Sequence, residues 1–537
     1  MKRLTYIIIG LLGMMTVQAQ NIKERIHVET DKDFYLAGEQ MGLKLHATDT
    51  QGKPQEFSRI AYIELLGDKD NALRLKVEMK DAVGEAAIQL PYTLASGVYD
   101  LVAYTRWMRN EGEQVFFRKQ IGVFNSLRYI RNTDQLIFLM EEEVPVSTTL
   151  PHNEGIQVKT DKLQYGNREK ITLSIEDIPK DAHLSVSVVR KDIDLKKEVP
   201  PTIIKEKEDK MYQPEMEGLI LETRLEGTKE SSSIVRPNLT IQGDRLHYYA
   251  GQQTADGMIV FYTTTLPGIT EIVTTTGGIG HLQPLSPFVA TPPAQMRPIT
   301  LYRQNEKALK ERSIAFQTTD YFYPEKEPVS VPEEDWLSTI IPKWEFDLDH
   351  YKRFSTFEET FIEFMPCVKL TGTKGNRRIV AFDSDIQASS NGNTLVMLDG
   401  VAVMNHELLL AYSPHLVKLV EVYVEDFVFG NQVYNGILSL KTLNLKLSGF
   451  DLLRTSIICD YEGVHPQTEM YLPSAAEDTP VHMPDLRHTL YWNPNVTAKD
   501  SRLTFQTSDM CGTYIVKVEG RTKGGEHLIG YTSFDVE

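Results

Sequence analysis

Residues 393–442 read NTLVMLDGVAVMNHELLLAYSPHLVKLVEVYVEDFVFGNQVYNGILSLKT, and short apolar runs in this stretch alternate with turn residues. The aliphatic run 395–398 stops at Asp399-Gly400, which is followed directly by the apolar residues 401–403. Asp-Gly favours the positive φ angles of a two-residue hairpin turn. The stretch therefore predicts a β-hairpin in which the role of Asp399 is conformational.

A helix and two further strands are predicted after this hairpin. Residues 406–412 contain helix-forming Leu and Ala, and the proline that follows prevents the helix from continuing. Residues 417–424 and 436–442 are rich in Val, Leu and Ile, which favours strands. Ahead of the stretch, four phenylalanines at helical spacing predict an opening helix over 349–365. Together these elements predict one compact α+β unit.

This order of elements resembles the plug domain of TonB-dependent outer-membrane receptors. The resemblance rests on the strand before Asp399-Gly400, the helix, the strand containing Glu421 and the Asn-Gly-Ile strand that ends in Lys441-Thr442. It implies a degenerate plug-like α+β domain over 347–445. In those receptors the plug fills a barrel of about 22 strands, each about 9 to 11 residues long. Too few residues follow Thr442 for such a barrel, so we expect a plug-like domain without its own barrel.

Length and charge bound the remaining possibilities. The chain has 537 residues and a formal net charge of −17. This length exceeds a single hydrophobic core and predicts about three to five domains. Nucleic-acid binding needs a basic face, so we expect no nucleic-acid partner. Short runs of Val, Ile, Thr and Tyr recur along the chain and favour a mainly β fold.

The first residues have the pattern of a secretory signal. Lys2-Arg3 is followed by the apolar stretch 7–15 and by small residues at 17–19, which predicts a signal peptide over 1–19. No later run is apolar and long enough to cross a bilayer. The three cysteines are too few for a disulfide framework, even in an exported chain. We therefore expect a periplasmic or outer-membrane-associated protein without a transmembrane segment in the mature chain.

Residues 20–125 predict a β-sandwich, because alternating apolar and polar runs recur there at the spacing of sandwich strands. Four segments, HVETDKDFYLAGE, SRIAYIELL, LPYTLASGVYDLVAYTRWMRN and FFRKQIGVF, resemble the macroglobulin-like domain of an exported family found in Bacteroidota. A second sandwich is indicated at 160–166, where Thr-Asp-Lys followed by Tyr and Gly repeats the order of the same residues at 30–38. HLSVSVVRKDID, DLRHTLYWNPNV and DMCGTYIVKVEGRT resemble further parts of the same family.

The predicted fold class is mainly β, with serial macroglobulin-like or immunoglobulin-like β-sandwiches and one small α+β plug-like domain. Within 215–320, residues 219–225, 239–241, 258–263, 271–276 and 313–316 are the expected strands. The predicted domains are a signal peptide (1–19), a first sandwich (20–125), a second sandwich with an exposed charged loop (150–214), a small β-domain (215–320), an acidic, proline-containing linker (321–346), the plug-like domain (347–445), a connector (446–483) and a C-terminal β-domain (484–537).

Catalytic motifs are missing from the sequence. It contains no Gly-x-Ser-x-Gly, Ser-x-x-Lys or His-Glu-x-x-His pattern, and no cysteine has a Cys or His at ligand spacing. We therefore predict no catalytic, cofactor-binding or metal-binding residue and no cofactor. Residues 37–40, Ala-Gly-Glu-Gln, resemble the thioester sequence of complement-like macroglobulins with Ala in place of Cys. Without the thiol no thioester forms, and the segment predicts a turn that needs Gly38.

Three other groups have two interpretations each. Asp347, Asp349 and His350 lie close together, and a capped helix start explains them better than a metal. Asp383, Asp385 and Asn391 suggest a calcium loop but lack the Gly and the distal Glu of an EF-hand. The segment Arg106-Trp107-Met108 fits either an exposed binding spot or strand-end packing with Arg106 over Trp107, and packing is the favoured interpretation.

The sequence thus favours an exported, non-enzymatic binding or scaffold protein of the cell envelope. Its expected partner is another envelope protein, such as an outer-membrane barrel or a transport complex. Two alternatives stay open: a protease-trapping macroglobulin-like protein that lacks a thioester, and an accessory-domain protein of a hydrolase system.

Overall fold

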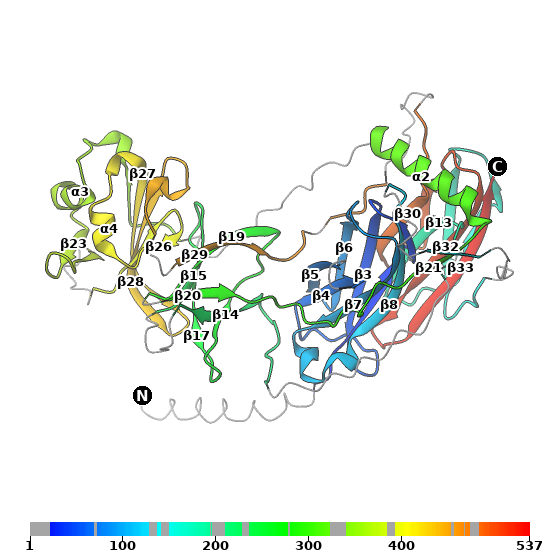
Figure 1. Cartoon of the computed structure of the whole chain (residues 1–537), viewed down its shortest axis with the longest axis horizontal. Helices are drawn as coiled ribbons and strands as arrows, with labels where there is room; N and C mark the ends of the chain where they lie inside the picture. The colour runs from blue at the N-terminus through cyan, green and yellow to red at the C-terminus, as the bar shows by residue number, and fades with distance from the viewer. Residues whose placement is uncertain are drawn as a thin grey trace. The chain divides into compact units, whose positions relative to one another are not determined.

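The computed structural model describes most of the chain, which falls into two compact units. The described residues are 22–68, 72–127, 137–140, 150–193, 195, 210–227, 236–277, 280–322, 340–383, 392–452, 456–466, 468–472 and 483–537. The first unit comprises Met1–Met216, Phe288–Val329 and Val464–Glu537, and the second comprises Glu217–Pro287 and Ser330–Gly463. The expected signal peptide lies outside the described residues. The fold is mainly β with serial sandwiches, as predicted (Figure 1).

The first sandwich is one curled, eight-stranded sheet. Its strands in spatial order are β1 (Arg25–Thr30), β3 (Gln40–Thr48), β6 (Val83–Gln89), β5 (Ala72–Lys80), β4 (Ile60–Leu66), β7 (Gly97–Thr105), β8 (Phe117–Phe124) and β2 (Phe34–Leu36). β1 and β2 are neighbours in sequence but lie at opposite edges of the sheet, and β1 also contacts β7. The sheet therefore folds back on itself around one core.

The second sandwich joins two distant parts of the chain. One sheet contains β10 (Gln157–Thr160), β12 (Lys170–Glu176) and β31 (Arg502–Gln506). The other contains, in order, β11 (Gln164–Tyr165), β33 (His527–Val536), β32 (Gly512–Thr522), β13 (Ala182–Arg190) and β30 (Thr489–Val496). Figure 1 shows β13 beside the red strands from the end of the chain.

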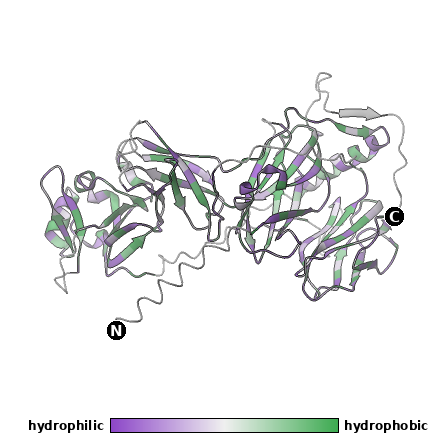
Figure 2. Ribbon diagram, turned by 90° about the horizontal axis from the view of Figure 1, so that it is seen from below, coloured by the Kyte–Doolittle hydropathy of each residue, from purple (hydrophilic) through white to green (hydrophobic). Residues whose placement is uncertain are grey.

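The prediction of a separate C-terminal domain over 484–537 is therefore wrong. β13 lies between β32 and β30, so its backbone needs hydrogen-bond partners on both edges, and the C-terminal strands supply them. Burial alternates along β32, with Tyr514, Val516 and Val518 facing the core. The same alternation of hydrophobic and hydrophilic residues is visible along the strands in Figure 2. These strands thus bury one apolar face against the N-terminal half of the same sandwich.

The repeated sequence at 30–38 and 160–166 forms the same hydrogen bonds in both sandwiches. The Tyr35 hydroxyl donates to Asp31 Oδ1 at 2.6 Å, and the Tyr165 hydroxyl donates to Asp161 Oδ1 at 2.8 Å. The same carboxylate oxygens also accept a backbone N–H, from Gly42 at 2.9 Å and from Thr172 at 2.7 Å. The internal repeat predicted from sequence is thus a repeated turn that ties its first strand to the third.

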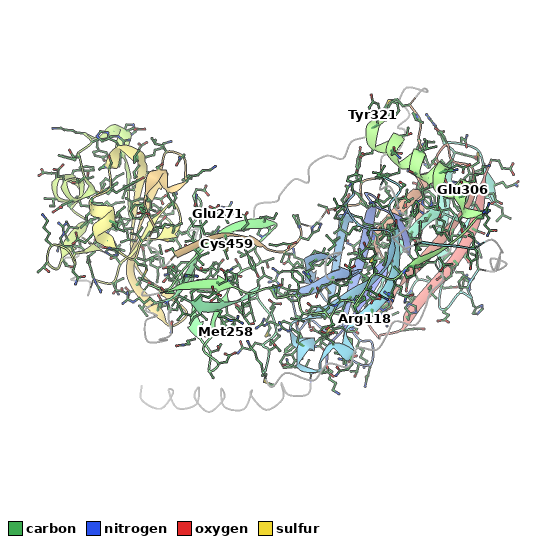
Figure 3. The ribbon with its side chains drawn as sticks, viewed as in Figure 1. Arg118, Met258, Glu271, Glu306, Tyr321 and Cys459 are labelled. Atoms are coloured by element: carbon green, nitrogen blue, oxygen red, sulfur yellow. The ribbon has the colours of Figure 1, made fainter. Side chains whose placement is uncertain are left out.

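A third sandwich lies in the second unit. One sheet holds β17 (Gln252–Gln253), β18 (Ile259–Tyr262), β14 (Ile220–Glu226) and β20 (His281–Pro284), and the other holds β16 (Tyr248–Ala250), β15 (Asn238–Ile241), β19 (Ile269–Thr275) and β29 (Ser456–Glu462). β29 pairs with β19 from Ile269↔Glu462 to Thr275↔Ser456. Glu271 and Cys459 mark the two strands in Figure 3. The prediction of a connector over 446–483 is therefore wrong at β29, because that strand covers one edge of β19.

The expected strand at 313–316 is wrong as well. These residues lie inside the helix α2 (Asn305–Phe322), whose ends are marked by Glu306 and Tyr321 in Figure 3. The helix contains neither Gly nor Pro, and its buried residues Leu309, Arg312 and Ala315 recur every three positions on one face. Together with β21 (Ile299–Tyr302), which pairs with β9 (Ile137–Met140), α2 belongs to the first unit.

The predicted linker over 321–346 has regular structure at both of its described ends. Residues 321–322 finish α2, and β22 (Trp344–Asp347) begins before position 346. β22 is extended because it pairs with Leu419–Val422 of β27 (Val417–Phe429) in the same sheet. The remainder of the predicted linker, 323–339, lies outside the described residues.

The α+β part of the second unit matches the elements predicted around 393–442. Its sheet has the order β22, β27 (Val417–Phe429), β28 (Gln432–Thr442), β25 (Leu395–Leu398) and β26 (Val401–Ala402). Helices α3 (Phe357–Phe364) and α4 (His406–Leu410) and the hairpin of β23 (Val368–Thr371) and β24 (Arg378–Ala381) pack with one face of this sheet around a shared core. The opening helix is confirmed over 357–364, but the prediction that it starts at 349 is wrong, because the Thr356 side chain caps the helix by accepting from Glu359 N.

The other face of this sheet packs on the third sandwich. Met397, Tyr423 and Phe427 share an apolar cluster with Leu246 and Tyr248. The sheet is thus covered on both faces, by helices on one side and by a β-sandwich on the other. We infer that residues 347–445 depend on their neighbours in the second unit for part of their core.

The Asp399-Gly400 turn is confirmed and does more than reverse the chain. Both residues have positive φ angles, 48° and 78°, and Leu398 pairs directly with Val401. A Cβ atom on Gly400 would lie 2.5 Å from the carbonyl oxygen of Ile241, so the close approach requires glycine. The fully buried Asp399 carboxylate accepts from Thr442 N, Thr442 Oγ1 and Leu447 N, each at 2.6 Å. It therefore fastens the hairpin to the end of β28.

All three cysteines are free. Cys367 is buried, Cys459 is partly buried and Cys511 is exposed. Burial raises the pKa of the Cys367 thiol to about 11.

We predict that Asp399→Ala destabilises the second unit more than Asp399→Asn does. Alanine leaves the buried N–H groups of Thr442 and Leu447 without an acceptor, at a cost of about 1–3 kcal/mol each, and also strains the positive φ. Asparagine tolerates that φ and keeps one carbonyl acceptor. Urea unfolding followed by tryptophan fluorescence measures the difference. Equal midpoints for both variants would mean that the carboxylate does not hold the hairpin.

Candidate functional site

The turn between β2 and β3 places a glutamate inside the first unit. Gly38 has a φ of 96°, and a Cβ atom there would lie 2.3 Å from the Tyr92 ring, so the predicted glycine turn is confirmed. The turn directs Glu39 inward, where its side chain is 8% exposed and accepts the Leu36 N–H at 3.2 Å. The thioester-like segment 37–40 is thus part of a structural turn.

Glu39 belongs to a buried ion network that is centred on Arg312 of α2. The Arg312 guanidinium donates from Nε to Glu39 Oε1 at 2.8 Å and from Nη2 to Glu39 Oε2 at 2.6 Å. It also donates from Nη1 to Asp192 Oδ2 at 3.0 Å and from Nη2 to the Phe34 carbonyl at 3.0 Å. The Arg312 side chain is 1% exposed. One guanidinium therefore links α2, the first sandwich and the segment after β13.

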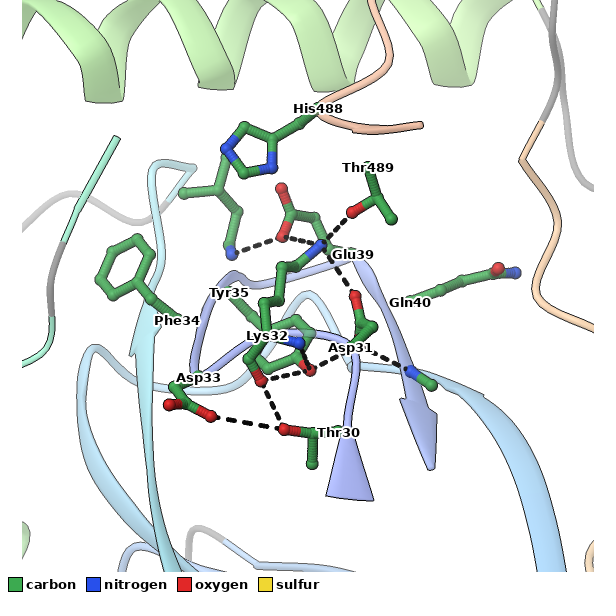
Figure 4. A network of polar contacts seen from close by, with 12 residues as sticks. Thr30, Asp31, Lys32, Asp33, Phe34, Tyr35, Glu39, Gln40, His488 and Thr489 are labelled. Carbon is green, nitrogen blue, oxygen red and sulfur yellow. Dashed lines mark hydrogen bonds and ion pairs between the residues drawn. The ribbon is translucent and has the colours of Figure 1, made fainter. Parts of the chain in front are cut away.

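Two further side chains, His488 and Lys32, complete this network, and Figure 4 shows Lys32 joined to Glu39 and Thr489. His488 Nε2 lies 2.8 Å from Asp192 Oδ2. Lys32 Nζ lies 3.3 Å from Glu39 Oε2 and donates to Thr489 Oγ1 at 3.1 Å. Residues 488–489 begin the C-terminal half of the second sandwich. The network therefore joins the two sandwiches of the first unit through paired charges.

Burial and charge set the ionisation of this network. Burial alone would raise the pKa of Glu39, but the charges of Arg312 and Lys32 outweigh it and lower the pKa to about 2. The pKa of Asp192 is also lowered, since the Arg312 charge and the hydrogen bonds from His488 and Arg312 outweigh burial. Burial and then the Arg312 charge lower the pKa of His488, so its neutral form donates to Asp192 at neutral pH.

The cavity beside this network is small. It has a volume of about 130 Å³ and is lined by Lys32, Glu39, Arg312 and His488 among others. Pockets that hold drug-sized ligands usually measure about 300–1,000 Å³. The charged groups here also satisfy one another, so the arrangement suits a structural joint better than a ligand site. Asp192 lies in the exposed charged loop that was expected within 150–214, and that expectation is wrong at this residue because its side chain is only 5% exposed.

A larger polar groove lies in the second unit and is named the arginine groove here. It has a volume of about 450 Å³. Its lining includes Arg236, Arg377, Arg378, Asn393, Asn405, His406, Glu407 and Tyr434. Arg377 directly precedes β24, Arg378 begins it, and the N-terminus of α4 carries His406 and Glu407. Its volume falls within the range of ligand pockets.

The charges of the arginine groove are unbalanced. Arg377 pairs with Glu407 at 2.9 Å and also with Glu358. Arg378 is exposed and forms no ion pair within the described part of the chain. Arg236 donates to the neutral Asn393 Oδ1 at 2.5 Å and lies 6.0 Å from the Tyr434 ring centre. Two guanidinium groups thus remain without an acidic partner among the described residues.

The acid–base groups of the arginine groove are already engaged. His406 Nδ1 accepts the Ile379 N–H at 2.9 Å, and burial followed by the Arg378 charge lowers its pKa to about 4. Glu407 accepts from Gly375 N, Arg377 N and the Arg377 guanidinium, which lowers its pKa to about 2. Both groups are weak bases at neutral pH, because their lone pairs are occupied.

The acidic groups that the sequence analysis weighed as metal or calcium sites have structural roles where the structure describes them. Asp347 caps a short 3₁₀ helix by accepting from Asp349 N, which confirms the capping interpretation. Asp383 pairs with Lys343 Nζ at 2.6 Å, while Asp385 and Asn391 lie outside the described residues.

The segment 106–108 packs within the first unit. Arg106 is 4% exposed, and its guanidinium lies 5.3 Å from the Tyr212 ring centre. Trp107 packs edge-to-face on Phe57 and donates from Nε1 to the Ile22 carbonyl at 2.8 Å. Met108 is fully buried. Packing at the strand end is confirmed, with Tyr212 as the ring under Arg106 in place of the predicted Trp107.

One group of metal-ligating side chains comes together in the described residues. Ligand atoms of His27, Glu519 and His527 lie within 4.8 Å of one another. The sequence predicts no metal-binding residue. Residue spacing could not reveal this group, because His27 lies near the start of the chain and Glu519 and His527 lie near its end. The pairing of β32 with β33 and the packing of the two sandwiches bring them together.

Comparisons with known proteins add little to this geometry. No protein-family model and no curated protein matches the chain. Trypsin-activated α2-macroglobulin from Escherichia coli is similar at 9% identity and a TM-score of 0.23, over 96% of this chain and 41% of that one. α2-Macroglobulin from Salmonella is similar at 8% identity and a TM-score of 0.21, over 96% of this chain and 40% of that one. Latent PorU from Porphyromonas gingivalis is similar at 10% identity and a TM-score of 0.14, over 96% of this chain and 34% of that one. The chain spans about two fifths of the length of the α2-macroglobulins. TM-scores this low establish neither a common fold nor a common function.

We predict that Arg312→Met lowers the stability of the first unit at pH 7 by about 3–5 kcal/mol, because it leaves Glu39 and Asp192 buried without their cation. In the native protein the folded pKa of Glu39, about 2, is below its ordinary value of 4.5. The stabilisation is therefore complete above about pH 4.5 and is lost as the pH falls toward 2. Urea titrations at pH 7 and pH 3.5 measure both effects.

Lys307→Met is the matched control for this variant. Lys307 lies on the same helix, is 88% exposed and reaches Glu311 only at 3.8 Å. Surface pairs of this kind contribute little, so we expect a change below about 0.5 kcal/mol. The difference between Arg312→Met and the native protein should narrow at pH 3.5. If the difference in unfolding free energy between Arg312→Met and the native protein stayed constant with pH, the network around Arg312 would not stabilise the first unit through its ion pairs.

Proposed function

We propose that this chain is an exported, non-enzymatic binding or scaffold protein of the cell envelope, and that it holds a protein partner at the arginine groove. The observation that carries the proposal is the charge of that groove. The whole chain has a net charge of −17, yet the groove presents two guanidinium groups without an acidic partner in the described residues. A carboxylate-bearing segment of another protein fits this chemistry.

Arginine suits such a partner for geometric reasons. Its planar guanidinium offers several N–H donors that match the two oxygens of a carboxylate. Asn393 and Asn405 add side-chain amide groups along the same lining. A peptide segment with one or more acidic side chains would thus meet both charged and neutral hydrogen-bonding groups.

The state of His406 and Glu407 supports binding without catalysis. A general base needs a free lone pair and a pKa near the working pH. Both groups instead accept backbone N–H groups, and their pKa values are about 4 and about 2. The arginine groove therefore offers donors to a ligand but no poised base.

The envelope setting rests on the sequence. The predicted signal peptide implies export, and the plug-like and macroglobulin-like resemblances imply an outer-membrane neighbourhood of the kind found in Bacteroidota. Among the helices of the described residues, none is both long and apolar enough to span a bilayer. We propose that contact with an envelope protein, such as an outer-membrane barrel, accounts for any membrane association.

Cell fractionation tests this proposal with a charge-reversal variant. We predict that the native protein sediments in part with the outer membrane and that Arg378→Glu shifts it to the soluble periplasmic fraction. Each lost charge-assisted hydrogen bond costs about 1.5–3 kcal/mol, which weakens binding about tenfold or more.

Lys374→Glu serves as the matched control, since Lys374 is exposed on the same loop but does not line the groove. It should leave the distribution unchanged. The proposal fails if the native protein is wholly soluble in the periplasm and binds no envelope protein. If Arg378→Glu and Lys374→Glu have the same distribution between the outer-membrane and periplasmic fractions, the arginine groove is not the site of binding.

A further inference from the structure

A cluster of two histidines and one glutamate lies where the two sandwiches of the first unit meet. His27 lies on β1 of the first sandwich. Glu519 lies on β32 and His527 on β33 of the second sandwich. In the register of these strands Glu519 faces Ile529 and His527 faces Arg521, so Glu519 and His527 are diagonal neighbours on one face. The cluster thus draws its side chains from both sandwiches.

The distances within the cluster suit a tetrahedral metal ion. His527 Nε2 lies 3.2 Å from Glu519 Oε1, and His27 Nε2 lies 3.8 Å from the same oxygen. Metal–ligand distances of about 2.0–2.2 Å for zinc place neighbouring tetrahedral ligands about 3.3–3.6 Å apart. The separations of 3.2 and 3.8 Å lie on either side of this range, and all three ligand atoms lie within 4.8 Å of one another.

We propose that His27 Nε2, Glu519 Oε1 and His527 Nε2 bind one divalent transition-metal ion, with zinc as the first candidate. Two imidazoles and one carboxylate favour zinc, copper, nickel or iron over calcium and magnesium, which prefer all-oxygen sites. The side chains of His27 and His527 are 28% and 34% exposed, so the cluster lies close to the surface although His27 Nε2 itself is buried. The same exposure gives the ion a path from solution.

The surroundings of Glu519 orient it for this role. Lys517 Nζ lies 3.0 Å from Glu519 Oε2 and donates to the Thr30 carbonyl at 3.3 Å. This contact holds one carboxylate oxygen and leaves Oε1 directed at both histidines. Partners of this kind position the ligands of many metal sites. The positive charge of Lys517 opposes any dication. Binding of the ion therefore depends on the two imidazole nitrogens as well as on the carboxylate.

His27 supplies a second, independent observation. Its Nε2 atom is buried and has no hydrogen-bond partner, although buried polar atoms are usually satisfied. The Phe117 ring packs edge-to-face against the imidazole, with 5.2 Å between ring centres, and so restricts its orientation. A metal ion at the proposed position would satisfy this nitrogen. It would also join β1 to the pair β32–β33, and thereby link the two sandwiches a second time.

Metal titration of the tag-free mature protein tests the proposal. Zn²⁺ at about 100 µM should raise the melting temperature of the native protein by several degrees, since an ion that binds the folded state alone stabilises it. Co²⁺ should give the visible absorption of a four-coordinate site, at one ion per chain. Both signals should disappear in His27→Ala and in His527→Ala. These side chains are partly exposed, so neither variant should unfold the protein.

His350→Ala is the control, because that histidine is 80% exposed and lies in the other unit. It should keep both the temperature shift and the cobalt spectrum. The absence of both signals in the native protein would overturn the proposal. Signals that persist in His27→Ala and His527→Ala, or that vanish in His350→Ala, would also overturn it by placing the ion elsewhere.

Discussion

The first unit depends on one buried cation. Arg312 comes from a helix in the middle of the chain, and its guanidinium meets Glu39 from the first sandwich and Asp192 from the segment after β13. Buried carboxylates are costly unless they are paired and hydrogen-bonded. The position of α2 is therefore tied to the positions of both acidic residues. His488 extends the same constraint to the C-terminal strands, because it reaches Asp192 at 2.8 Å.

Local sequence signals predict local structure well in this chain. The Asp399-Gly400 turn, the helix capped by Thr356 and the repeated Thr-Asp-Lys turn all depend on residues within a few positions of one another. Each has a physical cause that is visible in the sequence: a positive φ, an N-cap acceptor, or a carboxylate that accepts a nearby hydroxyl and backbone N–H. Such features carry over directly from sequence to structure.

The pairing of strands that lie far apart in the sequence could not be predicted in the same way. β29 completes a sheet whose neighbouring strand, β19, lies far earlier in the chain, and β32 completes a sandwich that begins at Gln157. A strand's own sequence does not identify its partner, since many apolar strands are compatible with one edge. Arg312 likewise shows no signal of its burial, because its acidic partners lie in distant segments. The arginine groove and the His27, Glu519 and His527 cluster were missed for the same reason.

The charged groups are paired differently in the two units. In the first unit the described acidic and basic groups around Arg312 satisfy one another and hold the sandwiches together. In the second unit Arg236 and Arg378 have no acidic partner among the described residues, while Glu407 and His406 are engaged with backbone groups. A paired network favours stability, and an unbalanced one favours recognition of an outside charge. The arginine groove is therefore the binding site that we propose.

Hydrogen–deuterium exchange of the mature protein with outer-membrane vesicles from the source cells tests this binding role most directly. The account predicts slower exchange at residues 375–378 and 403–407, which line the arginine groove, when the vesicles are present. Arg378→Glu should abolish that protection. Unchanged exchange at these residues, with protection confined to other parts of the chain, would contradict the account.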